Sequence, residues 1–293
     1  MTHPSDENLI AEFESSAEKL MTATAGGMLT WRIWGEGTPL VLLHGGHGSW
    51  KHWFRNIPVL QNHFRLYVPD MPGMGDSRDV EYRDIADVAG YLASGLEELG
   101  VNGEYFLAGF SFGAQCAAHL HRAHRGRVRK AYLLGSIGMG RYVPLNRQLR
   151  RWRGVADEVE RLAIHRLNFL DFMVKDPAKV SPFLVKLHAQ QVESALLTPN
   201  ESFRPADIDD CLTEQPVPLM TIWGEYDALV KDYFDERIEF LKHYRPEAQY
   251  HIIPGAGHWI MYEAADEVNQ ILLEDLRRQC AVPEEALAVS EAD

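Results

Sequence analysis

The stretch GFSFG places Ser111 between two glycines and predicts a nucleophilic serine. Residues 105–108 predict a strand before it, and a helical pattern begins at Phe112. A strand that turns sharply into a helix needs residues without Cβ bulk around the turn, which Gly109 and Gly113 supply. Such a turn holds the serine in a strained conformation, with its hydroxyl pointing away from the sheet. A Gly-x-Ser-x-Gly sequence also arises by chance, so the flanking strand and helix support the prediction.

A serine hydroxyl is a poor nucleophile unless a histidine accepts its proton and a carboxylate orients that histidine. Among 13 histidines, His258 follows the last strand-like segment in the glycine-rich stretch IIPGAGHW. It is therefore expected at the carboxyl edge of the sheet, where Ser111 would project. The carboxylate should follow the preceding strand, and TIWGEYDALV offers both Glu225 and Asp227 there. The order serine, acid, histidine along the chain is the one expected of this type of site.

Backbone amides supply the third requirement, a site for negative charge. The turn at Ser111 sets the amide of Phe112 at a helix N-terminus, where N–H groups and the helix dipole favour an anion. The glycine-rich stretch HGGHGSWKH follows another strand, Leu40–Leu43, and is best explained by close backbone approach to an oxyanion. We expect its histidines to shape the loop.

Metal and nucleotide sites are not indicated by the sequence. In HLHRAH, His119 and His121 lie two apart on a predicted helix and cannot face one ligand, so we predict no metal there. The glycines of MPGMGDS are spaced like a phosphate loop, but no lysine follows them. No Gly-x-Gly-x-x-Gly opens a helix, so no nucleotide cofactor is expected.

The elements that would position these residues alternate between strands and helices. Strands are predicted at residues 40–43, 64–70, 104–109, 130–135, 218–224 and 249–255, and helices at 84–99, 112–124 and 265–279. Alternation of this kind predicts an α/β fold with a mostly parallel sheet and helices on both faces. Ligands in such sheets bind beyond the carboxyl ends of the strands.

The domain organisation is expected to be a single core with one insertion. Residues 1–140 and 206–280 would form the core, opened by an amphipathic helix over about 5–22. Residues 28–34 and 40–43, on either side of two glycines, predict a hairpin that leads into the first buried strand. Residues 141–205 show helical spacing and no convincing strand, and we interpret them as a helical lid. The small, acidic residues 281–293 predict a disordered tail.

Composition narrows the range of partners. The formal net charge of −13 argues against nucleic acid. Three widely spaced cysteines, Cys116, Cys211 and Cys280, suggest neither a disulfide framework nor a zinc site. The N-terminus lacks the features of a signal peptide, and no apolar stretch approaches the roughly 18 residues of a membrane span. We therefore expect a cytoplasmic protein with a small-molecule substrate, and a homo-oligomer is left open.

Five stretches together resemble the successive signatures of the α/β-hydrolase superfamily: LVLLHGGHGSW, YVPDMPGMGDS, GFSFG, WGEYD and GAGHW. The resemblance covers nearly the whole chain and implies the α/β-hydrolase fold. It favours Asp227 over Glu225, because the acid lies two residues further round the turn. It also implies that the amide of Gly46 completes the oxyanion hole with that of Phe112, and His47 is the neighbouring candidate. Haloalkane dehalogenases and epoxide hydrolases carry aspartate where this chain has Ser111, so neither of these two activities is expected.

The expected function is a serine hydrolase that acts on a carboxylic ester or related acyl substrate through Ser111, His258 and Asp227. One alternative is a carbon–carbon bond hydrolase, because GHWIMYEAADEVN is similar to the tail of meta-cleavage-product hydrolases, although GFSFGAQ lacks their usual Ser-Met-Gly. The other alternative is a receptor on the same fold without turnover, against which an intact triad argues.

Three residues are weaker candidates for substrate contact. Trp50 and Trp259 flank the proposed site and either line an apolar pocket or fill the core. Arg141 belongs to a cluster of arginines in the insertion, of which we expect one or two to bind a substrate carboxylate and the rest to be solvated. The cluster consists of Arg141, Arg147, Arg150, Arg151, Arg153, Arg161 and Arg166.

Overall fold

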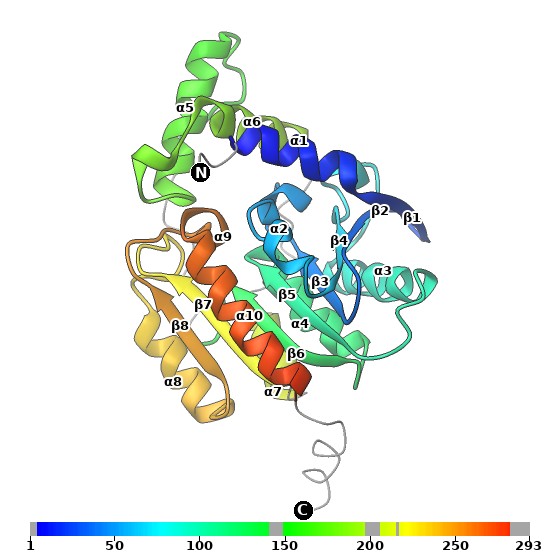
Figure 1. Cartoon of the computed structure of the whole chain (residues 1–293). Coiled ribbons are helices and arrows are strands. Elements are labelled where there is room, and N and C mark those ends of the chain that lie inside the picture. Colours follow the sequence, from blue (N-terminus) through cyan, green and yellow to red (C-terminus); the bar gives the residue numbers. More distant parts are fainter. Residues whose placement is uncertain (1–4, 141–148, 197–205, 215–216, 282–293) are drawn as a thin grey trace, which may run out of the picture.

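The computed structural model describes residues 5–140, 149–196, 206–214 and 217–281, which form an eight-stranded sheet with helices on both faces (Figure 1). The strands are β1 (Glu18–Thr24), β2 (Gly27–Trp34), β3 (Pro39–Leu43), β4 (Arg65–Pro69), β5 (Tyr105–Phe110), β6 (Val128–Leu134), β7 (Leu219–Gly224) and β8 (Gln249–Ile253). Their order across the sheet is β1-β2-β4-β3-β5-β6-β7-β8. The pairs β1–β2 and β2–β4 are antiparallel and the others are parallel, which confirms the predicted mostly parallel sheet.

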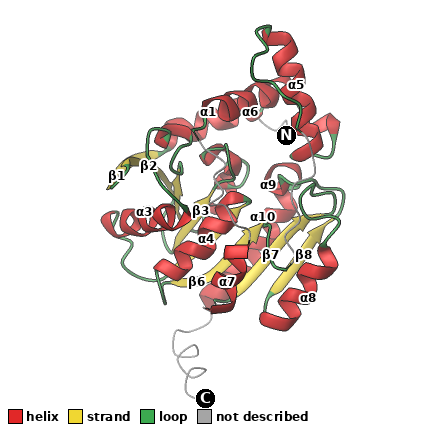
Figure 2. Ribbon diagram, turned by 180° about the vertical axis from the view of Figure 1, so that it is seen from behind, coloured by secondary structure: helices red, strands yellow, loops and turns green. Residues whose placement is uncertain are grey.

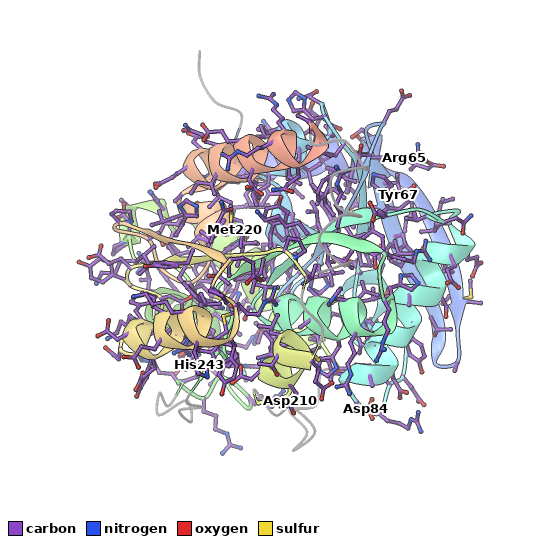
Figure 3. The ribbon with its side chains drawn as sticks, turned by 90° about the horizontal axis from the view of Figure 1, so that it is seen from below. Arg65, Tyr67, Asp84, Asp210, Met220 and His243 are labelled. Atoms are coloured by element: carbon purple, nitrogen blue, oxygen red, sulfur yellow. The ribbon has the colours of Figure 1, made fainter. Side chains whose placement is uncertain are left out.

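The helices form a layer on each face of the sheet. They are α1 (Asp6–Ser16), α2 (Ile57–Leu60), α3 (Ile85–Glu98), α4 (Phe112–Ala123), α5 (Glu158–Phe172), α6 (Pro182–Ser194), α7 (Ala206–Glu214), α8 (Phe234–Tyr244), α9 (Ile260–Glu263) and α10 (Ala265–Ala281), with short 3₁₀ helices η1 (Trp50–Trp53), η2 (Gly75–Ser77) and η3 (Pro177–Lys179). Helix α10 covers one face (Figure 1). Helices α3, α4, α7 and α8 cover the other, and the view from below shows both layers, with Asp210 on α7 and His243 on α8 labelled (Figures 2 and 3).

Two apolar cores follow from the pleat of the sheet. Because successive side chains of a strand point to opposite faces, Leu40 and Leu42 of β3 pack in the core beneath α10, and Val41 and Leu43 pack in the core beneath α3 and α4. All of β5 is buried. This two-sided burial explains why the parallel strands read as continuous apolar runs in the sequence.

The N-terminal helix is shorter than expected. The helix predicted over 5–22 ends at Ser16, and Glu18–Thr24 forms the edge strand β1. Ile10 and Phe13 are the buried residues of α1, whereas the side chains of Leu20 and Met21 are exposed by 36% and 51%. The last two residues therefore do not continue the apolar stripe, and the helical spacing that included them was misleading.

The hairpin predicted between residues 28–34 and 40–43 is wrong. Strand β2 pairs with β1 through a tight turn, and β4 lies between β2 and β3. The connection from β2 to β3 passes through Gly35, which has a φ of 71° and packs against the backbone of Gln61. The connection therefore passes the start of β4 and does not fold back as a hairpin.

The segment between β6 and β7 carries α5, η3, α6 and α7. Of the insertion expected over 141–205, the structure describes 149–196, and this part consists of helices and loops without a strand. Helices α5 and α6 lie with α1 beyond one end of the sheet (Figures 1 and 2). Arg141 and residues 282–293 of the expected tail lie outside the described residues.

The cysteines form no disulfide. Cys116 and Cys211 are buried, and Cys280 is exposed. The helix α10 has 17 residues, and a membrane-spanning helix needs about 20 apolar ones. None of the helices in the described ranges is long and apolar enough to cross a membrane.

Candidate active site

The turn from β5 into α4 has the geometry that the spacing of its glycines predicts. Ser111 has φ 52° and ψ −113°, a left-handed conformation that is rare for residues with a side chain. A Cβ on Gly109 would lie 2.2 Å from the carbonyl oxygen of Gly113, and one on Gly113 would lie 2.4 Å from that of Leu43. Neither position admits a side chain. The N–H of Ser111 donates to the carbonyl oxygen of Leu134 at 2.8 Å, which ties the turn to β6.

His258 and Asp227 meet beneath the surface of the molecule. Nδ1 of His258 lies 2.8 Å from Oδ2 of Asp227, and their side chains are exposed by 1% and 0%. Oδ1 of Asp227 accepts the N–H of Leu229 at 2.9 Å. The carboxylate is thus held on both oxygens and fixes the orientation of the imidazole.

Glu225, the alternative acid, does not contact His258 and bonds to a neighbouring loop. Its side chain is exposed, and its Oε2 accepts the N–H of Gly255 at 2.9 Å. It therefore links the two loops that follow β7 and β8. The structure brings Asp227, and not Glu225, to the histidine.

The ring of His258 lies beside the turn that carries Ser111. Its centroid is 4.8 Å from that of Phe110, the residue before the serine, and 5.5 Å from that of Phe172 on α5. No hydrogen bond joins the Ser111 hydroxyl to His258, both of which are described residues. Hydrogen bonds of this kind often tighten only when a substrate is bound.

Gly46 and His47 form the tip of a tight turn after β3. The N–H of Gly48 donates to the carbonyl oxygen of Gly45 at 3.2 Å, and His47 has a φ of 56°. Within the described ranges, the N–H groups of Gly46 and His47 donate to no protein group. Phe112, the other candidate donor, is the first residue of α4 and lies at its positively polarised end. Gly46 and His47 therefore both remain candidate donors.

Two buried histidines hold the peptide that precedes Gly46. Nε2 of His44 accepts the N–H of Met71 at 2.9 Å, so its Nδ1 carries the proton and donates to the carbonyl oxygen of Gly45 at 2.8 Å. Because a peptide unit is planar and trans, this bond also fixes the direction of the Gly46 N–H. The N–H of Gly45 in turn donates to Nδ1 of His52 at 3.1 Å.

Both histidines must be neutral to make these hydrogen bonds. Burial lowers the pKa of His44, and burial together with neighbouring histidines holds the pKa of His52 well below its usual value. A Cβ on Gly48 would lie 2.2 Å from the ring of His52, so the loop wraps closely around that ring. The sequence predicts only that these histidines shape the loop, and no pattern in it identifies His52 as the partner of Gly45.

Glu263 is a second residue that the sequence analysis missed. Its buried carboxylate accepts three backbone N–H groups, from Gly257 at 2.7 Å, Lys175 at 3.0 Å and Asp176 at 2.7 Å. Gly257 immediately precedes His258, and the other two follow α5. Glu263 therefore fastens the loop of His258 to the inserted segment. The only signal in the sequence is its place near the end of GHWIMYE.

A cavity of about 530 Å³ lies between the Gly46–His47 turn and the inserted helices. Its wall includes Gly46, His47, Leu149, Arg150, Arg151, Trp152, Arg153, His165, Asn168, Phe172, Met173, His188 and Val192. The cavity therefore adjoins both the candidate oxyanion loop and Phe172, which packs on His258.

The two tryptophans do not line this cavity. Trp50 is exposed by 1%, and its Nε1 donates to Glu14 at 3.1 Å. Trp259 is exposed by 3%, and its Nε1 donates to the carbonyl oxygen of His52 at 2.9 Å. Both side chains belong to the apolar core beneath α10. Within the described ranges, no group of three or more histidine, cysteine or acidic side chains is arranged to hold a metal ion.

Comparisons with known proteins agree with the fold. The sequence profile of the alpha/beta hydrolase family matches residues 40–271. The chain is 25% identical over 283 residues to a 2-hydroxy-6-oxo-6-phenylhexa-2,4-dienoate hydrolase of Burkholderia cepacia, which covers 90% of this chain and 97% of the relative. It is 26% identical over 264 residues to a pimeloyl-[acyl-carrier protein] methyl ester esterase of Vibrio cholerae, covering 84% and 97%. The structure of a Bacillus subtilis carboxylesterase superposes with a TM-score of 0.73 at 22% identity, covering 92% of this chain and 95% of that one.

Exchange of the two acids distinguishes their roles. Asp227→Asn should lower kcat for an ester substrate by about 10⁴-fold, because the amide no longer holds His258 in the required tautomer. Glu225→Gln should change kcat by less than about threefold, because Glu225 bonds only to the neighbouring loop. Steady-state kinetics of both variants measure this difference. The reverse pattern would assign the acid to Glu225.

Loss of His52 should disturb the Gly46 turn. His52→Ala removes the acceptor of the Gly45 N–H and should lower kcat by about 10- to 100-fold with a smaller change in KM. His52→Gln keeps an acceptor and should lose less, and exposed His243→Ala is the control. A purely structural role would instead lower the melting temperature of His52→Ala and leave its kcat near that of the parent.

His188, which packs 4.7 Å from the ring of Phe169, should make stability depend on pH. Burial lowers its pKa from 6.5 to about 3, so the unfolded chain binds more protons between these values. The free energy of unfolding should therefore fall as the pH falls below 6.5, by up to about 1.4 kcal/mol per pH unit from this residue. Urea unfolding at pH 7.5 and 5.0 should show a smaller loss for His188→Gln than for the parent or for His243→Gln. An equal loss in all three proteins would contradict the account.

Proposed function

The chain belongs to the alpha/beta hydrolase family, and we propose that it is a serine hydrolase that acts on a carboxylic ester or a related acyl substrate. The observation that carries this proposal is the buried 2.8 Å contact between His258 and Asp227, next to a serine in a left-handed turn. A binding protein without turnover has no need for this arrangement. The esterases among the relatives and structural neighbours support an acyl substrate.

In the proposed reaction Ser111 is the nucleophile. Its Oγ attacks the acyl carbonyl carbon while Nε2 of His258 accepts the hydroxyl proton, and Asp227 stabilises the imidazolium that forms. The amides of Phe112 and Gly46 donate to the oxyanion. His258 then gives the proton to the leaving alcohol as the carbon–oxygen bond breaks. Water repeats the sequence on the acyl-enzyme, releases the acid and restores the serine.

The surroundings of His258 suit this proton transfer. Phe110 and Phe172 pack on the ring, which is almost completely shielded from solvent. Exclusion of water strengthens the interaction between the imidazolium and Asp227. Glu263 holds the loop that carries His258, and His44 and His52 hold the loop that carries Gly46.

A carbon–carbon bond hydrolase is the second candidate. It is favoured by the dienoate hydrolase of Burkholderia cepacia, which aligns with 90% of this chain. The same serine, histidine and oxyanion hole would serve, but a proton must reach the substrate carbon before the bond breaks, because a free carbanion is a poor leaving group. An enzyme built for that step should consume dienone acids quickly and short aryl esters poorly.

Substrate panels separate the two candidates. We expect the protein to hydrolyse short 4-nitrophenyl esters. We expect it to consume a dienone acid more slowly, as measured by the loss of that compound's visible absorbance. Ser111→Ala should abolish both activities, because alanine removes the nucleophile and adds no bulk to the turn. Retained ester turnover in Ser111→Ala would refute the mechanism. A kcat/KM for the dienone acid at least about 100-fold above that of the best ester, or about 2.7 kcal/mol, would favour the carbon–carbon hydrolase.

A further inference from the structure

The cavity beside the Gly46–His47 turn carries positive charge in an otherwise acidic protein. The chain has a formal net charge of −13, yet three arginines, Arg150, Arg151 and Arg153, belong to the cavity wall. The described residues of that wall include no aspartate or glutamate. A cavity of this kind attracts an anion that the rest of the surface repels.

The structure separates these arginines by what their guanidinium groups already contact. Arg150 forms an ion pair with Asp171. Arg151 has no hydrogen bond or ion pair within the described part of the chain, and Arg153 lies over the ring of Trp152 at 5.0 Å without a carboxylate partner there. Two cations of the cavity are therefore not neutralised by the described residues.

Two other described arginines of the sequence cluster do not fit this role. Arg161 is paired with Glu193 at 3.0 Å. Arg166, on α5, does not belong to the cavity wall. Arg141 and Arg147 lie outside the described residues. Among the described residues, the expectation of one or two substrate-binding arginines thus narrows to Arg151 and Arg153.

These two residues lie on the same cavity as the candidate oxyanion loop. Burial and the positive charge of Arg153 both lower the pKa of His47. His47 follows Gly46 directly in the chain. Leu149, Phe172, Met173 and Val192 supply an apolar wall to the same space. A single ligand could therefore bring a carbonyl to Gly46, an apolar chain to this wall and an anionic group to the arginines.

We propose that Arg151 and Arg153 form an anion-binding subsite, so that the preferred substrate is an acyl compound that carries a carboxylate or phosphate group. This inference rests on the proposed hydrolase function and names its substrate class. The planar guanidinium groups can donate two parallel N–H bonds to either anion. Arg151 and Arg153 are exposed in the structure. A substrate that covers them would shield the ion pair from water and so strengthen it.

A matched pair of esters tests the subsite. Mono-4-nitrophenyl adipate and 4-nitrophenyl hexanoate have acyl chains of equal length and differ by a terminal carboxylate. We expect kcat/KM of the parent to favour the adipate ester, chiefly through KM. Arg151→Gln and Arg153→Gln should each lower the adipate-to-hexanoate ratio of kcat/KM by about tenfold. Arg166→Gln should leave that ratio unchanged, and Arg151→Lys should restore part of it.

Competition identifies the anion. Adipate and pentyl phosphate are tested as inhibitors of hexanoate ester hydrolysis, and inhibition by either one that is lost in Arg151→Gln supports the subsite. Inhibition by neither, or a ratio of kcat/KM that is equal in the parent and both glutamine variants, overturns it. These outcomes are distinct from failure of the proposed function, in which hexanoate hydrolysis would persist in Ser111→Ala.

Discussion

The left-handed backbone of Ser111 is the constraint on which the rest of the site depends. Such a conformation costs about 1–3 kcal/mol and persists only where surrounding contacts fix it. The close approach of Gly113 to the end of β3 is one of these contacts, and it brings the start of the loop with Gly46 against the turn that carries the serine. The N–H of Ser111 adds a bond to β6. A single packing requirement thus places both the candidate nucleophile and the candidate oxyanion loop.

Local patterns predicted those features that depend on local backbone geometry. The parallel strands read as apolar runs because both of their faces are buried, and GFSFG predicted its turn because only glycine fits at residues 109 and 113. The pairing of β2 with β4 was missed, because it joins segments more than 30 residues apart and their spacing does not encode it. Leu20 and Met21 misled the helix prediction for a similar reason, since edge-strand pairing decides their structure.

Side-chain contacts across the fold were equally invisible in the sequence. The bond from Gly45 to His52 and the three bonds to Glu263 depend on where loops meet after folding. Asp227 and Glu225 illustrate the same limit, because the turn offers both acids and the structure brings only the first to His258. The neutral buried His44 and His52 hold the candidate oxyanion loop, whereas Arg151 and Arg153, which have no carboxylate partner among the described residues, lie on the wall of the adjoining cavity.

Covalent labelling tests most directly whether Ser111 is an activated nucleophile. A fluorophosphonate reacts with a serine that an adjacent histidine activates, and peptide mass spectrometry locates the adduct. The account predicts one stoichiometric adduct, on Ser111, which forms at least about 100-fold more slowly in Asp227→Asn because His258 loses its orienting partner. An adduct on a different serine, or a labelling rate that is unchanged in Asp227→Asn, would contradict it.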